Sequence, residues 1–369
     1  MKILIAPNTM KGSLSAFDFA DIVEKALLRY SDDFEITKIP MADGGDLTGE
    51  VLERNLRAQR VEVNVRGPLG KVVKSKYAFA GKTAIIEMAD ASGMKLLSPD
   101  ELNPLLTSSY GTGELIGHAI DSGCSGILLA IGGSATVDGG LGMMHALGFV
   151  MLDKDGNKLE GRGEDLNRLV KIEISDILQE VNIRIICDVD NPLLGEQGAA
   201  AVFGPQKGAT PEMVNELETG LENLAKILRR ESGKDLGNIA GVGAAGGLSL
   251  PLLAFGRAEI VPGADFICQQ LDLEKWIRWA DVVITGEGKI DSQTLNNKAP
   301  FAVAKLARLH NKPVLAIGGS VAAEASSAFD AVFSLARPGV STKQAIQYPR
   351  KYLFQTASEV ARSLKRYNK

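Results

Sequence analysis

Five short polar segments carry most of the residues of this chain that could perform chemistry. The most distinctive is 132–142, where five of eleven positions are glycine and Asp138 is the only charged residue. It follows an apolar stretch, 126–131, that is typical of a buried strand, and it precedes a helix-like stretch, 143–147. A glycine turn in this position can present backbone N–H groups to an anion such as a phosphate. The alternative is a purely structural tight turn.

Two of the segments lie near the N-terminus. In 7–13, Lys11 stands beside a glycine just before a predicted helix, which suits a phosphate or a carboxylate, although most such lysines are only exposed turn residues. In 43–46, Asp43 and Asp46 frame two glycines. Helix capping by one aspartate is the simpler interpretation, and contact with a metal or a substrate is the alternative.

The other segments follow later strands and helices. Segment 103–114 places three consecutive hydroxyls at a helix start, and 187–193 places Asp188 and Asp190 at the end of a buried strand, where ionised groups require a cation or a hydroxyl partner. Segment 285–298 combines two acids and two lysines with two glycines after an apolar strand. That density is poorly explained by a surface turn.

Known nucleotide motifs are absent or out of context. The sequence contains neither Gly-x4-Gly-Lys-Ser/Thr nor a His-Arg-Asp loop, so it is not a P-loop protein or a protein kinase. Residues 241–246 match Gly-x-Gly-x-x-Gly, but the preceding residues 234–240 do not predict a strand. We therefore interpret this match as a helix entry, and a nicotinamide-dependent oxidoreductase stays the alternative that would use it.

Composition limits the class of protein. The chain has 369 residues, 45% hydrophobic and 23% charged, which is typical of soluble globular proteins. A net charge of −4 without a basic block argues against nucleic-acid and membrane-surface partners. Three separated cysteines and three scattered histidines predict buried thiols and no metal site built from these residues. No apolar run is long enough for a membrane span, and we expect a cytoplasmic protein.

Hydrophobic periodicity predicts two domains. Strands at 3–6 and 34–40 flank a helix capped by Ser15, which indicates a doubly wound sheet. After residue 59, short alternating strands predict an antiparallel meander at 60–66, 72–79 and 83–88. Beyond it, the middle region mixes strands (126–131, 147–152, 183–188) with helices, the clearest of which is capped by Thr210. The β-α rhythm returns after Trp279, with elements at 281–285, 297–310, 313–317, 331–335 and 354–364.

We therefore predict an α/β protein with a discontinuous Rossmann- or flavodoxin-like doubly wound domain. This domain comprises 1–59 plus 275–369, and a mixed α/β domain at 60–274 is inserted in it and carries the glycine-rich segment. One large α/β domain with an insertion is the alternative.

Together these segments resemble the bacterial glycerate kinase family, the type-1 family of glycerate 2-kinases that lacks a P-loop. The resemblance spans nearly the whole chain in collinear order. Its matching stretches are Ala6-Pro7-x-x-x-Lys11-Gly12-Ser13-Leu14-Ser15-Ala16, Pro40-Met41-Ala42-Asp43-Gly44-Gly45, residues 132–142, Asp188-Val189-Asp190-Asn191-Pro192-Leu193, Phe203-Gly204-Pro205-Gln206-Lys207-Gly208-Ala209 and Thr285-Gly286-Glu287-Gly288.

The resemblance implies a phosphotransferase that uses ATP and Mg²⁺ to phosphorylate D-glycerate in organic acid catabolism, in many members at the hydroxyl on carbon two. It also implies two α/β domains with the active site in the cleft between them. Two departures leave a related small hydroxy acid open as the substrate: Leu47 stands where the family usually has glycine, and Asn297 replaces the glycine before Lys298.

For a kinase of this kind, we assign candidate roles to the residues of these segments. The nucleotide-binding candidates are Gly132, Gly133, Ser134, Thr136, Asp138, Gly139, Lys207 and Glu287. The substrate-binding candidates are Ser108, Ser109, Lys289, Asp291 and Gln293. The catalytic candidates are Lys11, Asp43, Asp188 and Asp190, and the Mg²⁺ candidates are Asp188, Asp190 and Glu287.

Within these sets, Asp43 and Asp190 are alternatives for the carboxylate that orients the attacking hydroxyl, and Lys298 is a further source of positive charge. A non-catalytic sugar-acid sensor is a third possibility for the protein as a whole. The expected partner is a small molecule, and both a monomer and a homodimer are compatible with the sequence.

Overall fold

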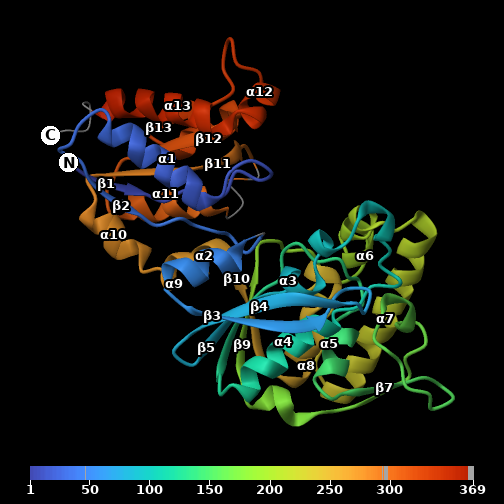
Figure 1. Cartoon of the computed structure of the whole chain (residues 1–369). Coiled ribbons are helices and arrows are strands. Elements are labelled where there is room, and N and C mark those ends of the chain that lie inside the picture. The colour runs from blue at the N-terminus through green and yellow to red at the C-terminus, as the bar shows by residue number, and fades with distance from the viewer. Residues whose placement is uncertain (46, 293, 295–297, 365–369) are drawn as a thin grey trace. The chain divides into compact units, whose positions relative to one another are not determined.

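The computed structural model describes residues 1–45, 47–292, 294 and 298–364. Contacts divide the chain into two compact units (Figure 1). Unit 1 comprises Met1–Asp43 and Pro262–Lys369, and unit 2 comprises Gly44–Val261. The α/β fold class that the periodicity predicts is confirmed, and each unit contains its own principal sheet.

Unit 1 is built on a five-stranded sheet in which every pair of neighbours is parallel. In spatial order its strands are β13 (Ala331–Ser334), β12 (Val314–Val321), β11 (Val282–Ile290), β1 (Lys2–Ile5) and β2 (Glu35–Lys38). All five agree with the strands that the sequence predicts, although β11 continues into the polar segment 285–298 and β12 continues to Val321. The extension of β11 makes Glu287 a strand residue rather than a loop residue.

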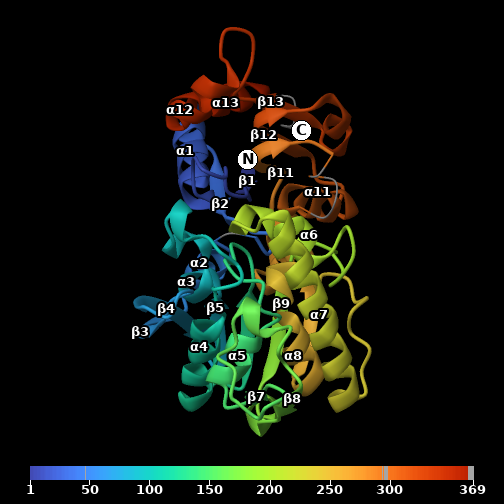
Figure 2. The same ribbon diagram turned by 90° about the vertical axis from the view of Figure 1, so that its right-hand side faces the viewer.

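Helices cover both faces of this sheet (Figure 2). Helix α1 (Ala16–Leu28) packs against α13 (Pro349–Ser363), and α10 (Leu273–Trp279) packs against α9 (Gly263–Gln270) and α11 (Ala299–Leu309). The short α12 (Thr342–Gln347) precedes α13. Ser15 caps α1 as predicted, because its side chain accepts a hydrogen bond from the Asp18 amide.

The chain leaves β1 toward β2 and leaves β11 toward β12, in opposite directions along the sheet. The point at which strand order reverses therefore lies between β1 and β11. In open parallel sheets ligands bind at such a point, outside the carboxyl ends of the strands.

Unit 2 contains a six-stranded sheet in which an antiparallel meander joins a parallel portion. Its strands in spatial order are β10 (Arg257–Pro262), β9 (Asn182–Cys187), β6 (Gly126–Ala130), β5 (Thr83–Glu87), β4 (Val72–Ala80) and β3 (Gln59–Arg66). The meander β3-β4-β5 confirms the prediction from alternating residues. A separate antiparallel pair is formed by β7 (Val150–Leu152) and β8 (Lys171–Glu173).

The helices of unit 2 enclose one large apolar core. They are α2 (Thr48–Asn55), α3 (Ala89–Ser92), α4 (Tyr110–Asp121), α5 (Leu141–Ala146), α6 (Ala199–Phe203), α7 (Pro211–Ser232) and α8 (Ser249–Phe255). Thr210 caps α7 through the Met213 amide, as expected. Short 3₁₀ helices complete the chain: η1 (Met94–Leu96), η2 (Pro99–Glu101), η3 (Gly163–Asp165), η4 (Asp176–Gln179), η5 (Pro205–Lys207), η6 (Ala244–Gly246) and η7 (Ala323–Ala328).

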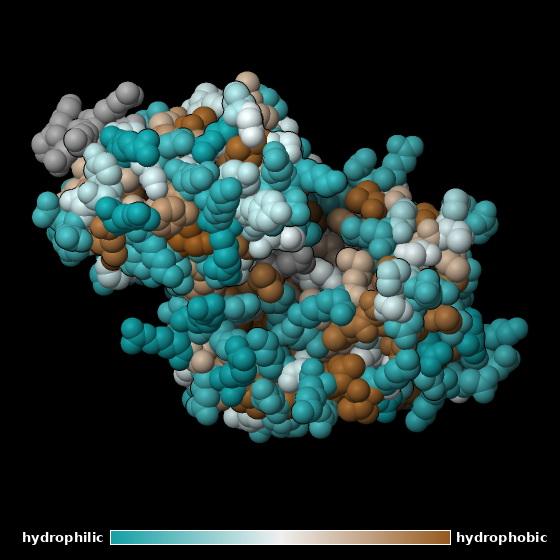
Figure 3. All heavy atoms as spheres, turned by 45° about the horizontal axis from the view of Figure 1, so that its top comes forward, coloured by the Kyte–Doolittle hydropathy of each residue, from teal (hydrophilic) through white to brown (hydrophobic). Residues whose placement is uncertain are grey.

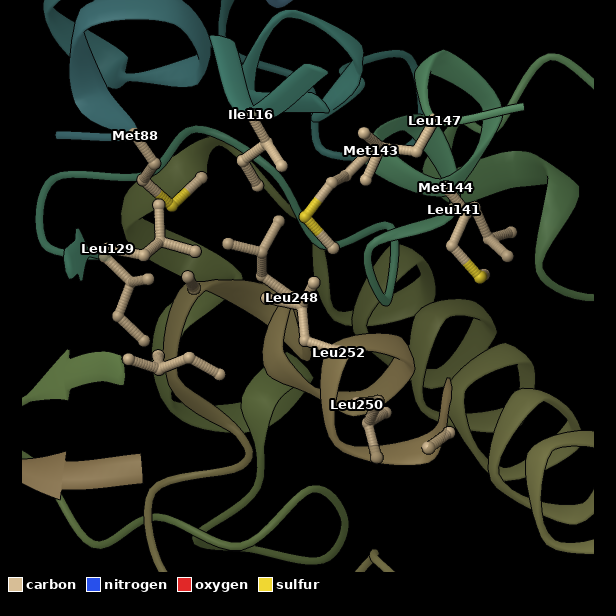
Figure 4. Packing of buried hydrophobic residues seen from close by; sticks show 14 of the residues in the cluster. Met88, Ile116, Leu129, Leu141, Met143, Met144, Leu147, Leu248, Leu250 and Leu252 are labelled. Carbon is tan, nitrogen blue, oxygen red and sulfur yellow. The ribbon is translucent and has the colours of Figure 1, made fainter. Parts of the chain in front are cut away.

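Helix α5, which follows the glycine-rich segment, is anchored in this core. Leu141, Met143 and Met144 are fully buried, and they share the cluster with Leu248 and Leu252 from the region of α8 (Figure 4). Complete burial of each such side chain contributes about 1.5–3 kcal/mol. The core therefore fixes the end of the glycine-rich segment.

The unit boundaries differ from the sequence-based boundaries near residues 59 and 275. Residues 44–59 belong to unit 2 because Glu87, at the end of β5, accepts hydrogen bonds from the Leu47 and Gly49 amides at the start of α2, both at 3.0 Å. At the other boundary, β10 completes the sheet of unit 2, and α9 already packs with the helices of unit 1.

Hydrophilic side chains cover much of the visible surface, with hydrophobic residues scattered among them (Figure 3). Isolated exposed apolar side chains are normal for globular proteins. Within the described residues, no helix is both long enough and apolar enough to span a bilayer.

Candidate active site

In unit 1, three of the predicted polar segments meet near the strand-order reversal. The Asn8 amide donates to the Gly286 carbonyl, and the Met41 amide donates to the Pro7 carbonyl, both at 2.8 Å. A side chain on Gly288 would place its Cβ 3.5 Å from the backbone nitrogen of Lys11. The loops after β1 and β2 therefore run beside β11, as their positions after parallel strands predict.

Asp43 is buried at this point, with 7% of its surface exposed. The Asn8 side chain donates to Asp43 Oδ2 at 3.0 Å, and Lys298 Nζ lies 3.7 Å from the same oxygen. A buried carboxylate requires such partners, because burial without them is costly. Asn8 and Lys298 thus hold Asp43 in a defined position.

Glu287 is the second buried acid of unit 1, with 9% of its surface exposed. Burial is the main cause that raises the pKa of Glu287 to about 7, and the charges of Asp43 and Asp291 act in the same direction. The Thr294 hydroxyl, which donates to Glu287 Oε1 at 2.6 Å, and Lys298 oppose that shift. A carboxyl group of this pKa can accept and release a proton near neutral pH.

The remaining candidates of unit 1 occupy different environments. Lys289 Nζ lies 2.7 Å from Asp291 Oδ2, and the lysine side chain is 71% exposed. The Asp291 carboxylate raises the pKa of Lys289 through their hydrogen bond. Lys11 is exposed. Gln293 lies outside the described residues.

In unit 2, Asp138 accepts hydrogen bonds from backbone amides in the second half of the glycine-rich segment. Asp138 is fully buried and accepts hydrogen bonds from the Ser109 amide and hydroxyl, each at 2.7 Å, from the Gly140 amide at 3.1 Å and from the Gly142 amide at 3.3 Å. Burial raises the pKa of Asp138, while these hydrogen bonds act in the opposite direction.

Several of the candidate residues make hydrogen bonds inside the protein. The amides of Gly140 and Gly142 are used inside the protein, and Asp138 and Ser109 bind one another instead of presenting their side chains to a ligand. The Gly139 amide donates to the Gly246 carbonyl at 2.9 Å. Thr136 is also fully buried, and its hydroxyl has no hydrogen-bond partner in the part of the chain that the structure describes.

The first half of the segment differs, since Gly132 and Gly133 are partly exposed. Among the described residues, no hydrogen bond uses the amides of Gly132, Gly133 or Ser134 as donors. Gly133 has φ +69°, and a turn that contains a left-handed residue can direct successive N–H groups toward one anion. A Cβ on Gly132 would lie 2.7 Å from the carbonyl carbon of Gly45, so this position requires glycine.

Lys207 contacts this first half of the glycine-rich segment, and only 2% of the lysine's surface is exposed. Its Nζ donates to the Ser134 hydroxyl at 2.8 Å and to the Thr136 carbonyl at 2.7 Å. Burial lowers the pKa of Lys207 to about 7, and the charge of Asp138 partly opposes the shift. Lys207, a nucleotide-binding candidate from the sequence, therefore makes both of these contacts inside unit 2.

The loop after β9 lies beside the glycines of the second segment. A Cβ on Gly44 would approach the Cys187 carbonyl carbon to 3.1 Å. Asp188 is half-buried, and Asp190 is exposed. Of the expected hydroxyl donors, Ser108 is half-buried and donates to the Gly161 carbonyl at 2.8 Å. No group of three His, Cys, Asp or Glu in the described parts of the chain could by itself hold a metal ion.

Comparison with known proteins identifies the family. The model of the glycerate kinase family matches residues 3–365. The chain belongs to this family. It is 44% identical to a glycerate kinase of Haemophilus influenzae, with 99% of both chains covered, and 42% identical to a glycerate 2-kinase of Escherichia coli, with 91% of this chain and 90% of that one covered. A crystal structure of a putative glycerate kinase 2 from Salmonella typhimurium LT2 superposes with a TM-score of 0.88 at 43% identity, covering 99% of this chain and 98% of that chain.

Family membership agrees with the position of residues 241–246. Residues 234–240, directly before them, form no strand, as the sequence predicts. The Gly243 amide donates to the Asn191 carbonyl at 3.0 Å, and Gly246 lies against Thr136, whose carbonyl oxygen would be 2.3 Å from a Cβ. These glycines support the two neighbouring loops, and nothing in their geometry favours a dinucleotide site.

The structure also adds two residues that the sequence did not single out. Asn8 bonds to Asp43, and Thr294 bonds to Glu287. Asn8 lies in segment 7–13 and Thr294 in segment 285–298, but neither the spacing from position 8 to 43 nor that from 287 to 294 identifies a contact. Their burial, 6% exposed for Asn8 and 1% for Thr294, was the missing information.

Proposed function

We propose that this protein transfers the terminal phosphoryl group of ATP to D-glycerate, at the hydroxyl on carbon two. The full-length relatives named glycerate kinase support the substrate, and the relative named glycerate 2-kinase supports the position. The single observation that carries the chemistry is the buried pair Asp43 and Glu287 where the strand order of unit 1 reverses, since phosphoryl transfer needs a group that orients the attacking hydroxyl.

In the proposed reaction, the glycerate hydroxyl oxygen forms a bond to the γ-phosphorus. The bond from that phosphorus to the β–γ bridging oxygen breaks, and ADP leaves with the bonding electrons. The hydroxyl proton passes to the acid pair of Asp43 and Glu287. The two carboxyls interact, because the charge of Asp43 helps to raise the pKa of Glu287. Of the two earlier candidates for this role, Asp43 is buried beside Glu287, whereas Asp190 is exposed.

Nucleotide phosphates bind the amides of Gly132, Gly133 and Ser134. Support comes from the partial exposure of the glycines and from the lack of protein acceptors for these donors among the described residues. Backbone amides and lysines are groups with which enzymes stabilise the charge of a transferring phosphoryl group. Lys11 is the exposed lysine that we assign to this charge.

Mg²⁺ usually takes one or two protein carboxylates and obtains its other ligands from water and phosphate. Asp188 and Asp190 fit that limited requirement because they offer oxygen ligands on one loop, and the described residues contain no cluster of three His, Cys, Asp or Glu that could form a complete cage. The chemistry that the ion supplies when bound is neutralisation of phosphate charge. Ser108, Lys289, Asp291 and Gln293 stay predictions for the contact with the glycerate carboxylate.

The test is ADP formation from ATP across a panel of small hydroxy acids, with and without Mg²⁺. We expect D-glycerate to stimulate ADP formation strongly and the stimulation to require Mg²⁺. A related hydroxy acid that is turned over much faster than D-glycerate would reassign the substrate. Absence of stimulation by every acid, or bound nicotinamide or flavin absorbance, would reject the kinase.

A further inference from the structure

We propose that Lys207 is a positioning residue that fixes the phosphate-binding amides of residues 132–134 from inside unit 2, without touching the nucleotide. This inference rests on the proposed function, because it concerns how the phosphates of ATP are bound. Its starting point is a lysine that is 2% exposed yet makes two hydrogen bonds to the glycine-rich segment. Lysine is almost never fully buried unless its ammonium group has partners.

The main chain that carries Lys207 is rigid. The residue ends helix η5, where its amide donates to the Gly204 carbonyl at 2.9 Å. The next residue, Gly208, has φ +91°, and a Cβ there would lie 2.3 Å from the Leu102 carbonyl oxygen. Only glycine fits at this turn, so the turn fixes the backbone position from which the Lys207 side chain extends into the core.

The ammonium group joins two points on either side of Ala135. It reaches the Ser134 hydroxyl on one side and the Thr136 carbonyl on the other. Ala135 itself is held because its amide donates to the Ser92 carbonyl and its carbonyl accepts from the Thr107 hydroxyl, both at 2.9 Å. Without Lys207, two buried acceptors would lack their donor, and the segment would have to shift to find others.

The charge state of Lys207 favours this role over direct neutralisation of phosphate. Its pKa of about 7 follows from burial, and Asp138 is the charged side chain whose field opposes the shift. Near neutral pH the side chain carries its charge only part of the time. Both the charged and the neutral amine have enough N–H groups for the two hydrogen bonds, so the contacts persist in either form.

The experiment measures the dissociation constant of ADP by calorimetry for the full-length protein and four variants. They are Lys207→Met, Ser134→Ala, the double variant, and Lys226→Met as a matched control on the exposed face of α7. We expect Lys207→Met to weaken ADP at least tenfold and Ser134→Ala to weaken it severalfold. The double variant should match Lys207→Met, because the Ser134 hydroxyl acts through the lysine. The control should bind like the wild type.

Steady-state kinetics provide the second readout. We expect the KM for ATP to rise in Lys207→Met while the KM for D-glycerate stays within twofold, a split that general loss of structure would not produce. Ser134→Ala keeps every backbone group, so it tests the contact even if Lys207→Met does not fold. Unchanged ADP affinity in Ser134→Ala and Lys207→Met, or effects that multiply in the double variant, would overturn the proposal. Wild-type protein that does not bind ADP would instead reject the proposed function itself.

Discussion

Replacing Asp138 by asparagine should loosen the glycine-rich segment by an amount that the hydrogen bonds allow us to work out. One carboxylate oxygen accepts from the Ser109 amide, the Ser109 hydroxyl and the Gly142 amide, and the other accepts from the Gly140 amide. An asparagine retains one side-chain oxygen, and it makes the most hydrogen bonds when that oxygen accepts from the first three donors. Its NH₂ group then faces the Gly140 N–H, so two donors meet in a fully buried site.

Loss of a hydrogen bond to a charged group costs about 1.5–3 kcal/mol, and the buried donor without an acceptor adds about 1–3 kcal/mol. Burial of a neutral amide in place of a charge recovers part of this cost, as the raised pKa of Asp138 indicates. We therefore expect a net destabilisation of about 2–4 kcal/mol, within the range of large single-residue effects.

The assay is hydrogen exchange measured by mass spectrometry on peptides that cover residues 132–147. Both tryptophans, Trp276 and Trp279, belong to unit 1, so tryptophan fluorescence would not report on this segment. A loss of about 2 kcal/mol corresponds to exchange about 30-fold faster in these peptides. Asp190→Asn is the matched control, because Asp190 is exposed. Hydrogen exchange in the peptides that cover residues 132–147 should be the same in this variant as in the wild type. Exchange in Asp138→Asn within twofold of the wild type would refute the reasoning.

Three further predictions follow from buried or strained residues. The pKa of Lys207 is lowered to about 7 in the folded protein, so between pH 7 and 10.5 the unfolded chain binds more protons than the folded chain. The free energy of unfolding therefore rises with pH over this range. The stability gained is complete above pH 10.5 and is lost as the pH falls through 7. Between pH 7 and 9, the free energy of unfolding should therefore rise by about 2 kcal/mol more in the wild type than in Lys207→Met. Denaturant titrations at each pH would measure this difference. An equal rise of the free energy of unfolding with pH in both proteins would contradict the buried position of Lys207. Leu47 has φ +66°, so Leu47→Gly should be more stable than Leu47→Ala by about 0.5–1 kcal/mol, and the reverse order in denaturation midpoints would exclude strain at this position. Glu287→Gln and Asp43→Asn should each lower kcat by about 10²–10⁴-fold with little change in thermal stability, and a loss below tenfold in both would remove the acid pair from the reaction.

Local signals in the sequence were sufficient for much of the fold. The strands β1, β11 and β12 of unit 1 begin as short apolar runs, and the caps Ser15 and Thr210 act on amides three residues away. Patterns of this range depend on neighbouring residues alone. The same holds for the position of the glycine-rich segment between β6 and α5.

What the sequence did not provide depends on contacts between distant residues. Asp138 takes its hydrogen bonds partly from Ser109, and Lys207 reaches Ser134 across 73 positions. From composition alone, a lysine and an aspartate near a glycine turn both suggest ligand contacts. The structure adds that both side chains are buried and hydrogen-bonded inside unit 2, which composition could not indicate.

The domain boundary that the sequence predicts near residue 59 differs from the unit boundary after Asp43 for the same reason. Helix α2 looked like the continuation of the first β-α-β-α pattern, since it follows β2 directly. The carboxylate that binds its first amides is Glu87, which lies 40 residues after Leu47. Helix α2 therefore belongs to unit 2, where it binds Glu87 and packs against β5 and β6.

The central claim concerns a phosphoryl group that moves from ATP to carbon two of D-glycerate, and phosphorus NMR of the reaction mixture tests it most directly. In a proton-coupled spectrum, a phosphate on carbon two is split by one neighbouring proton and gives a doublet, whereas a phosphate on carbon three is split by two and gives a triplet. We predict one new phosphomonoester doublet that grows in step with ADP. A triplet would move the reaction to the other hydroxyl, and inorganic phosphate with ADP as the only products would contradict the claim.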